Sequence, residues 1–227
     1  MRLAAIDIGS NAARLLISEA IPEKDGTVRF NKLNLVRVPL RLGFDVFEKG
    51  EISKEKRGMV LQTMKAYSHL INAYGVKQVI VCATSAMRDA SNSADIIRKV
   101  KLETGLEIEI ISGELEASLI YENHIAENMD TEHSYLYIDV GGGSTELTFF
   151  ADGKLISKES FNIGTIRLLK NTVTEAQWDA MKETIKLKTK GYKKIVAIGT
   201  GGNINKIFSL SKKKDGKIGR ASCRKRV

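Results

Sequence analysis

The chain of 227 residues is long enough for two small domains or one large one, and 43% hydrophobic residues with few aromatics is typical of a soluble globular protein. No stretch approaches the ~20 apolar residues of a membrane span, and Asp7 comes too early for an apolar leader, so we expect a cytoplasmic protein without a membrane partner. Two cysteines, Cys82 and Cys223, exclude a disulfide framework, and neither they nor the three histidines have metal-ligand spacing.

The net charge of +9 is concentrated at the C-terminus. Residues 212–227 carry eight basic residues against Asp215, a net of +7, so the rest of the chain is nearly neutral. A basic tail can bind nucleic acid or phosphate polymers. However, Ile218–Val227, IGRASCRKRV, resembles one reading frame of a common sequencing adapter. We therefore expect a non-native tail at 218–227, an interrupted natural sequence before it, and no specific nucleic-acid partner.

The first element in chain order is a hairpin. Residues Ala4–Ile17, AAIDIGSNAARLLI, form an apolar strand that ends in Asp7, a turn through Gly9, Ser10 and Asn11, and a second strand. A glycine-rich turn between strands, such as the one at Gly141–Thr145 further along the chain, is by itself more often structural than functional.

The chain then alternates strands and helices. We expect strands at 27–30 and 33–39, a basic loop at 41–50, an amphipathic helix at Lys54–Tyr74 with Ser53 as N-cap, and a buried parallel strand at Val76–Ala83. Arg88 follows at the strand end where open α/β sheets bind ligands. Pairing of Arg88 with Asp89 explains its position equally well.

A carboxylate pair opens the next long helix. After a helix at Ser93–Thr104 and a strand at Ile108–Ile111, a helix is expected at Glu114–Glu127, with Glu114 and Glu116 in its first turn. Carboxylates favour helix N-termini for reasons of the helix dipole alone; alternatively, one of the two is a general base. We place the domain boundary near residue 125, which gives a first domain at 1–125 and a second at 126–217.

The second domain begins with a glycine-rich hairpin, Tyr135–Phe150, YLYIDVGGGSTELTFF. Asp139 ends its first strand, and the glycines that follow lack the Cβ that would keep an anion from their amides. Ser144 and Thr145 add hydroxyl donors, and Asp139 could hold a cation such as Mg²⁺. A Walker or Rossmann loop would open a helix, whereas Glu146–Phe150 is rich in β-formers. The sequence therefore predicts a phosphate-binding turn between antiparallel strands.

The two hairpins align without gaps at an offset of 132 residues, with Asp7 on Asp139 and Gly9 on Gly141. Two related halves that face one ligand resemble the superfamily of acetate and sugar kinases, Hsp70 and actin. The resemblance implies an α/β fold of two actin-like, ribonuclease H-like domains with a phosphate-binding cleft between them and an incomplete second domain.

The last third of the chain predicts a strand at 157–161, a helix at Thr174–Thr189, a strand at Ile195–Ile198 and a helix at Ile204–Leu210. A glycine-rich turn with Gly199 and Gly201 precedes the last helix, in the order that suits an anion site.

Five stretches together resemble the Ppx/GppA phosphatase family: IDIGSN, ATSAMR, ISGELEA, IDVGGGSTE and IGTGGN. By this resemblance Glu116 matches the catalytic glutamate, Asp139 and Glu146 match acidic residues of the metal and phosphate site, and Arg88 matches a substrate-contacting arginine. Leu115 stands where some members have another Glu. The resemblance also implies an exopolyphosphatase-like hydrolase that releases terminal phosphate from polyphosphate or guanosine pentaphosphate.

In this scheme Mg²⁺ lies near Asp7, Asp139 and Glu146, and Glu116 deprotonates the attacking water. The predicted phosphate-binding residues are Gly9, Ser10, Asn11, Arg88, Gly141, Gly142, Gly143, Ser144, Thr145, Gly199 and Gly201. Two alternatives stay open: a non-enzymatic sensor of polyphosphate or guanosine tetraphosphate, and a small-molecule kinase of the same superfamily. A homodimer is also left open.

Overall fold

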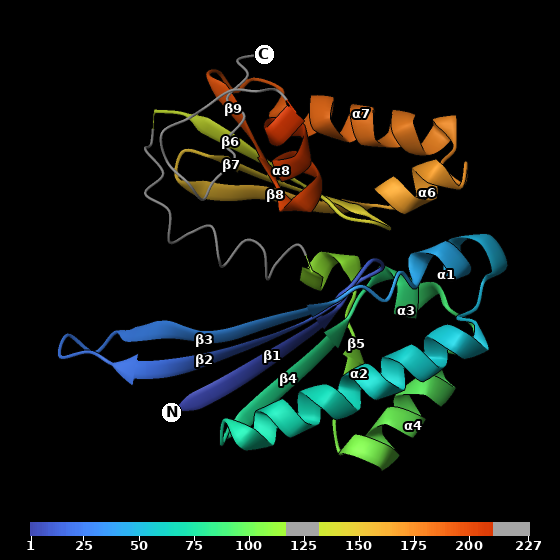
Figure 1. Ribbon diagram of the computed structural model, residues 1–227. Coiled ribbons are helices and arrows are strands. Elements are labelled where there is room, and N and C mark those ends of the chain that lie inside the picture. Colours follow the sequence, from blue (N-terminus) through green and yellow to red (C-terminus); the bar gives the residue numbers. More distant parts are fainter. Residues whose placement is uncertain (117–131, 211–227) are drawn as a thin grey trace. The chain divides into compact units, whose positions relative to one another are not determined.

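The computed structural model describes residues 1–116 and 132–210 and divides into two compact units, Met1–Ile111 and Ser112–Val227 (Figure 1). The predicted boundary near residue 125, the end of the helix predicted to close at Glu127 and the tail at 218–227 lie outside the described residues. The second unit starts at Ser112, and the helix that begins at Gly113 packs on a strand of that unit. A Cβ at Gly113 would lie 2.7 Å from the Cβ of Ser160.

The first unit contains a five-stranded sheet in the order β3-β2-β1-β4-β5. Its strands are β1 Arg2–Ile8, β2 Ala13–Pro22, β3 Val28–Val38, β4 Gln78–Ala83 and β5 Ile108–Ile110. Strands β1, β2 and β3 pair antiparallel, whereas β4 pairs parallel with both β1 and β5. The sequence predicts two strands where β3 is one, since this edge strand pairs with β2 along its whole length.

The helices of the first unit are α1 Gly43–Lys49, α2 Lys54–Ala73, α3 Ser85–Asp89 and α4 Ser93–Thr104. The loop predicted at 41–50 is wrong, because α1 occupies most of it. Val46 and Phe47 are buried on one side of α1, and Gly50 ends the helix in the left-handed conformation at φ 75°. The Ser53 hydroxyl accepts a hydrogen bond from the Lys56 amide, so the predicted N-cap of α2 is confirmed.

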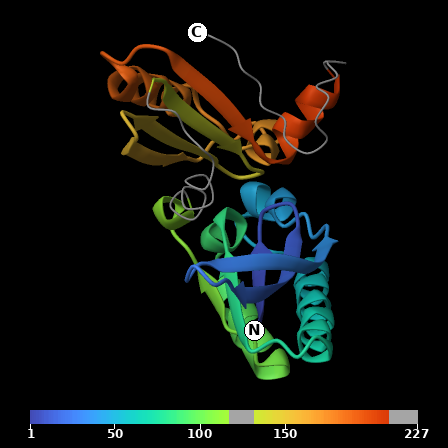
Figure 2. The ribbon, with the colours of Figure 1, turned by 90° about the vertical axis from the view of Figure 1, so that its left-hand side faces the viewer.

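The core of the first unit lies between α2, α4 and one face of the sheet (Figures 1 and 2). Alternate residues of the central strands, including Ile6 and Leu15, are buried on this face together with Met64 and Tyr67 of α2. The Tyr67 hydroxyl donates to the Ala13 carbonyl at 3.0 Å. This bond fixes α2 beside the start of β2, where the first predicted phosphate turn ends.

The second unit contains a four-stranded sheet in the order β8-β7-β6-β9. Its elements are β6 Ser134–Val140, β7 Thr145–Ala151, β8 Lys154–Phe161, α6 Thr165–Leu169, α7 Glu175–Thr189, β9 Ile195–Thr200 and α8 Gly201–Leu210. Its core joins Leu136, Leu147 and Phe149 of the sheet to Met181 and Ile185 of α7. Helix α8 begins three residues earlier than predicted, directly after β9.

The internal repeat is confirmed by the strand register. Asp7 lies opposite Arg14 in the first sheet, and Asp139 lies opposite Glu146 in the second, each 132 residues further along. The order β3-β2-β1-β4 corresponds to β8-β7-β6-β9, with the same parallel and antiparallel pairs. The predicted α/β class of two related sheets is therefore correct. Within the described ranges, no helix has both the length and the apolar character to cross a membrane.

Candidate phosphate-binding and cation-binding site

The first predicted phosphate-binding turn joins β1 to β2. The Gly9 amide donates to the Ala12 carbonyl at 3.0 Å and closes the turn. The hydroxyl groups of Ser10 and Ser85 lie 2.8 Å apart, and both residues are buried. Within the described part of the chain, the amides of Ser10 and Asn11 make no hydrogen bond.

The carbonyl groups of the same turn are occupied. The Asn11 carbonyl accepts from the Arg41 amide and the Ser10 carbonyl from the Gly43 amide, both at 2.8 Å. The start of α1 and the residues just before it therefore hold the acceptor side of the turn. On its donor side the amides of Ser10 and Asn11 have no partner among the described residues, an arrangement typical of anion-binding runs of backbone amides.

The second predicted turn, between β6 and β7, repeats this geometry. The Gly141 amide donates to the Ser144 carbonyl at 2.9 Å, which is the bond of the first turn shifted by 132 residues. The amides of Gly142 and Gly143 make no hydrogen bond in the parts of the chain that the structure describes. None of the turn glycines has a positive φ. Their missing side chains, and not a left-handed backbone, give an anion access to the amides.

The start of α6 holds the glycine turn from its acceptor side. The bonds run from the Thr165 amide to Gly141, from the Ile166 amide to Gly142 and from Arg167 Nε to Gly143, at 3.1, 2.8 and 2.7 Å. The approach is so close that a Cβ at Gly164 would lie 2.4 Å from the Gly142 carbonyl oxygen. Sequence reasoning missed Gly164, because only this contact distinguishes it from an ordinary turn glycine.

The hydroxyl groups predicted as phosphate donors are inside the unit. Ser144 and Thr145 are both buried, with 3% and 4% of their surfaces exposed. The Thr145 hydroxyl donates to the Ile163 carbonyl at 2.6 Å, so its proton is already used within the protein. In this conformation the turn therefore offers an anion its backbone amides.

A row of polar side chains crosses the second sheet at the carboxyl end of β6. Asp139 lies opposite Glu146, Glu146 opposite Ser160, and Thr200 beside Asp139, so all four share the face away from α7. Glu146 is only 4% exposed and accepts from the Ser160 hydroxyl at 3.1 Å. The Thr200 hydroxyl oxygen is buried, and among the described residues it has no hydrogen-bond partner.

These residues fit a hard cation. Carboxylates directly opposite each other repel, and a divalent cation relieves that repulsion. No group of three or more His, Cys, Asp or Glu in residues 1–116 and 132–210 could hold a metal ion. Mg²⁺ usually binds one or two carboxylates together with water and phosphate oxygens. Asp139 and Glu146, with the buried Thr200 hydroxyl beside them, suit that smaller ligand set.

The equivalent row of the first sheet has a different charge. Asp7 forms an ion pair with Arg14 at 3.0 Å, and both side chains are about half exposed. Arg37 lies beyond Arg14, and Cys82 beside Asp7. Burial, followed by the charges of Glu109 and Asp7, raises the pKa of the Cys82 thiol. Arg14 thus places a positive charge opposite Asp7, whereas the residue opposite Asp139 is the carboxylate of Glu146.

The two candidate base carboxylates lie in the first turn of the helix that begins at Gly113. The Ser112 hydroxyl accepts from the Leu115 amide at 3.1 Å, and its carbonyl accepts from the Glu116 amide at 2.9 Å. Glu114 is exposed, whereas Glu116 is partly buried. The contact between Gly113 and Ser160 brings this turn to the Glu146 end of the polar row.

Arg88 lies in the short helix α3, directly after β4. Its Nη1 donates to the Ile111 carbonyl at 2.8 Å, so the side chain bridges the ends of β4 and β5. This bond uses one of the five donors of the guanidinium. A contact between Arg88 and substrate stays a prediction.

The third glycine-rich stretch is tighter than the sequence suggests. Gly199 lies within β9, and a Cβ there would come within 2.8 Å of the Ile204 side chain. The missing side chain lets α8 pack on β9. Gly201 is the first residue of α8, and Asn203 Nδ2 donates to the Val140 carbonyl at the end of β6. Binding of phosphate at this helix start stays a prediction.

Comparisons with known proteins agree with this architecture. The sequence model of the Ppx/GppA phosphatase family matches residues 21–203. The bifunctional 3-dehydroquinate synthase/phosphatase of Fusobacterium nucleatum is 34% identical over 200 residues, which are 84% of this chain and 29% of that protein. Exopolyphosphatase 1 of Mycobacterium tuberculosis is 30% identical over 168 residues, 74% of this chain and 48% of that protein. The chain thus spans less than half the length of these curated relatives.

A solved structure shows the same fold. The crystal structure of an exopolyphosphatase from Cytophaga hutchinsonii superposes with a TM-score of 0.80 at 26% identity. The match covers 95% of this chain and 73% of that one.

Proposed function

Because the chain belongs to the Ppx/GppA phosphatase family, we propose that it hydrolyses the terminal phosphoanhydride bond of inorganic polyphosphate or guanosine pentaphosphate and releases phosphate. One observation carries the proposal: in both units a turn has its carbonyls bonded to the protein and two amides without a partner among the described residues. Such turns bind phosphate oxygens. In the first unit the amides of Ser10 and Asn11 would bind phosphate oxygens, and in the second unit those of Gly142 and Gly143 would do the same.

The polar row of the second unit would hold Mg²⁺ through Asp139 and Glu146. A bound cation would neutralise the charge that develops on the transferred phosphoryl group. We assign the cation to these two residues and not to Asp7, because Arg14 already lies 3.0 Å from the Asp7 carboxylate. The Ser160 hydroxyl would orient Glu146 through its hydrogen bond of 3.1 Å.

Glu116 would act as the general base. It would take a proton from a water molecule whose oxygen forms a bond to the terminal phosphorus while the bridging phosphorus–oxygen bond breaks. The shortened phosphate chain leaves with the bonding electron pair. Glu116 is favoured over Glu114 because it is partly buried, whereas Glu114 points into solvent at the helix start, where a carboxylate stabilises the helix dipole.

The proposal is tested by measuring phosphate release from tripolyphosphate, long-chain polyphosphate and guanosine pentaphosphate with Mg²⁺. We expect release from at least one of these substrates, and loss of release when the cation is removed by a chelator. Tight binding without release would identify a sensor instead. Nucleotide-dependent phosphorylation of a small molecule, without release of phosphate from polyphosphate, would identify a kinase.

A further inference from the structure

Arg41, which follows β3, has an unusual backbone conformation. Its φ is 54°, in the left-handed region that bulky residues avoid. Asp152, Asn171 and Lys194 also have positive φ. The short polar side chains of Asp152 and Asn171 tolerate this conformation far better, so among the described residues only Lys194 has a long side chain in the same conformation as Arg41. A strained residue persists only where its surroundings hold it, and such residues gather at functional sites.

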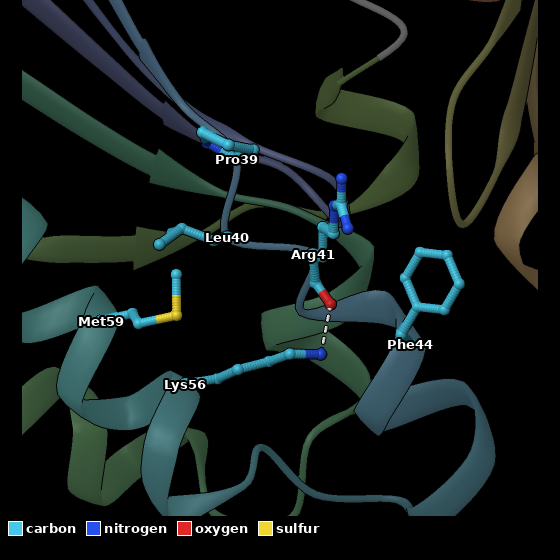
Figure 3. Close-up of a pocket in the computed structure, with 6 residues that line it drawn as sticks. All are labelled: Pro39, Leu40, Arg41, Phe44, Lys56 and Met59. Atoms are coloured by element: carbon cyan, nitrogen blue, oxygen red, sulfur yellow. Dashed lines mark hydrogen bonds between the residues drawn. The ribbon is translucent and has the colours of Figure 1, made fainter.

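The surroundings of Arg41 hold its backbone at both ends. Its amide donates to the Asn11 carbonyl at 2.8 Å, and its carbonyl accepts from the Phe44 amide at 3.2 Å. The carbonyl also accepts from Lys56 Nζ at 2.7 Å (Figure 3). Lys56 is itself fixed by a largely buried ion pair with Asp45. Burial would raise the pKa of Asp45, but hydrogen bonds from Lys56 and Ser53 outweigh it and lower the pKa.

The side chain of Arg41, in contrast, is not held. It is exposed, and within the described part of the chain its guanidinium has no hydrogen-bond or ion-pair partner. Figure 3 shows the Arg41 carbonyl facing Lys56 and the guanidinium pointing away from it. The residue also lines a pocket of about 390 Å³ together with Pro39, Leu40, Phe44, Lys56 and Met59.

In the second unit an arginine binds the equivalent turn carbonyl through its side chain. The Gly143 carbonyl is equivalent to that of Asn11, and it accepts its hydrogen bond from the side chain of Arg167 at 2.7 Å. An arginine thus holds the same carbonyl in both units. In the second unit it does so with its guanidinium, whereas in the first it does so with its amide, which leaves the guanidinium beside the turn available.

We propose that Arg41 is a further substrate-binding residue, whose guanidinium binds phosphate oxygens of the polyanionic substrate next to the Ser10–Asn11 turn. The assignment rests on the proposed function, since the ligand is the same phosphate chain. The planar guanidinium offers paired donors that match two phosphate oxygens. Asn11 therefore has two tasks: its amide faces the anion, and its carbonyl positions Arg41. The strained φ aims the guanidinium at the substrate.

The decisive variant is Arg41→Gly. Glycine adopts positive φ without strain, so removing the side chain should raise the thermal midpoint of the full chain. Affinity for tripolyphosphate and guanosine pentaphosphate, measured by calorimetry in the presence of a chelator, should fall roughly 10-fold or more, the usual loss for a charge-assisted pair. Higher stability with weaker binding is a combination that a purely structural role does not produce.

Two further variants sharpen the result. Arg41→Lys keeps the charge but loses the paired donors, so its affinity should lie between those of the parent and of Arg41→Gly. Arg57→Gln is the matched control, because Arg57 is an exposed arginine of the same unit on α2 and lies outside the turn. Its affinity should stay within about 2-fold of the parent, since a distant exposed charge is largely screened by salt.

The outcomes separate this assignment from the proposed function. Gly142→Val tests the proposed function separately, because its side chain would block access of an anion to the amides of the second turn. Unchanged affinity in Arg41→Gly together with weakened affinity in Gly142→Val would overturn the role of Arg41 alone. An equal loss in Arg41→Gly and Arg57→Gln would also overturn it, because the effect would then reflect net charge. A parent chain that binds neither probe would overturn the proposed function and this assignment with it.

Discussion

The two sheets share strand order, register and turn geometry, yet the side chains at the ends of their central strands differ in charge. In the first unit Asp7 is paired with Arg14, and Arg37 lies beyond. In the second unit Asp139 faces Glu146. Duplication of a backbone therefore does not duplicate its chemistry, because one residue change opposite a shared aspartate turns an ion pair into a pair of carboxylates.

The two pairs of side chains also differ in how far they are buried. The Asp7–Arg14 pair is about half exposed, so solvent screens it and its contribution to stability is small. Glu146 is 4% exposed and cannot rely on water in the same way. A buried charge needs a partner or a metal ion. The comparison supports our proposal that the cation binds in the second unit, whereas the turn of the first unit is flanked by cationic side chains.

The largest effect is expected for the hydrolysis rate when Glu116, next to the polar row of the second unit, is replaced. Glu116→Gln keeps the size of the side chain but cannot accept the proton of water, so hydrolysis should fall by ~10²–10⁴-fold. Binding of tripolyphosphate should be unchanged or tighter, because a negative charge is removed. Steady-state phosphate release and calorimetry measure the two quantities.

Glu114→Gln is the matched control for this variant. Glu114 is exposed in the same helical turn. The hydrolysis rate of the Glu114→Gln variant should therefore fall only a few-fold. Equal small losses in both variants would show that the pair only stabilises the helix start, and the base would then have to be sought at Asp139.

The next effect tests how the second turn is supported. Gly164→Ala places a Cβ 2.4 Å from the Gly142 carbonyl, and the backbone must shift to accept it. We expect the free energy of unfolding to fall by about 1–3 kcal/mol, as is usual for overpacking. Gly58→Ala, in an open position on α2, should instead raise it by up to ~1 kcal/mol. Chemical denaturation that shows no loss for Gly164→Ala would contradict this close approach.

Glu146→Gln tests the carboxylate pair directly. Without a cation, the free energy of unfolding should rise by roughly 0.2–1 kcal/mol, because like charges in opposite positions repel. Affinity for Mg²⁺, measured by calorimetry on the full chain, should fall about 10-fold or more as one anionic ligand is lost. Arg14→Gln in the first unit should leave Mg²⁺ affinity nearly unchanged. If Arg14→Gln lowered Mg²⁺ affinity as strongly as Glu146→Gln, the proposed difference in cation binding between the two units would be wrong.

The smallest effect concerns Thr200, whose hydroxyl is buried without a partner in the described ranges. Thr200→Val has the same shape and removes that hydroxyl, so the cation-free protein should gain about 1 kcal/mol of unfolding free energy. Mg²⁺ affinity should fall a few-fold. Cys82→Val, at the equivalent strand position of the first unit, should leave that affinity unchanged. Lower stability of cation-free Thr200→Val would show that the hydroxyl already has a partner.

The sequence by itself determined the parts of the fold that depend on local patterns. The alternation of apolar residues and the turn glycines predicted both hairpins, and their alignment predicted the repeat that the strand register confirms. The N-cap of α2 at Ser53 was also predicted from the local sequence, and its hydrogen bond is present. Helix α1 was missed because its short apolar face, with Val46 and Phe47, interrupts a stretch that otherwise looks polar.

Only the tertiary structure decided which side chains meet. Arg14 opposite Asp7 and Ser160 opposite Glu146 are neighbours across paired strands of a hairpin, and Thr200 beside Asp139 is a neighbour across strands that are far apart in the chain. Their pairing depends on a register that the whole sheet sets, and a shift of one residue would turn each side chain to the other face. The same holds for Arg41, since its strained backbone is held by Asn11 and Lys56 through contacts that no local pattern contains.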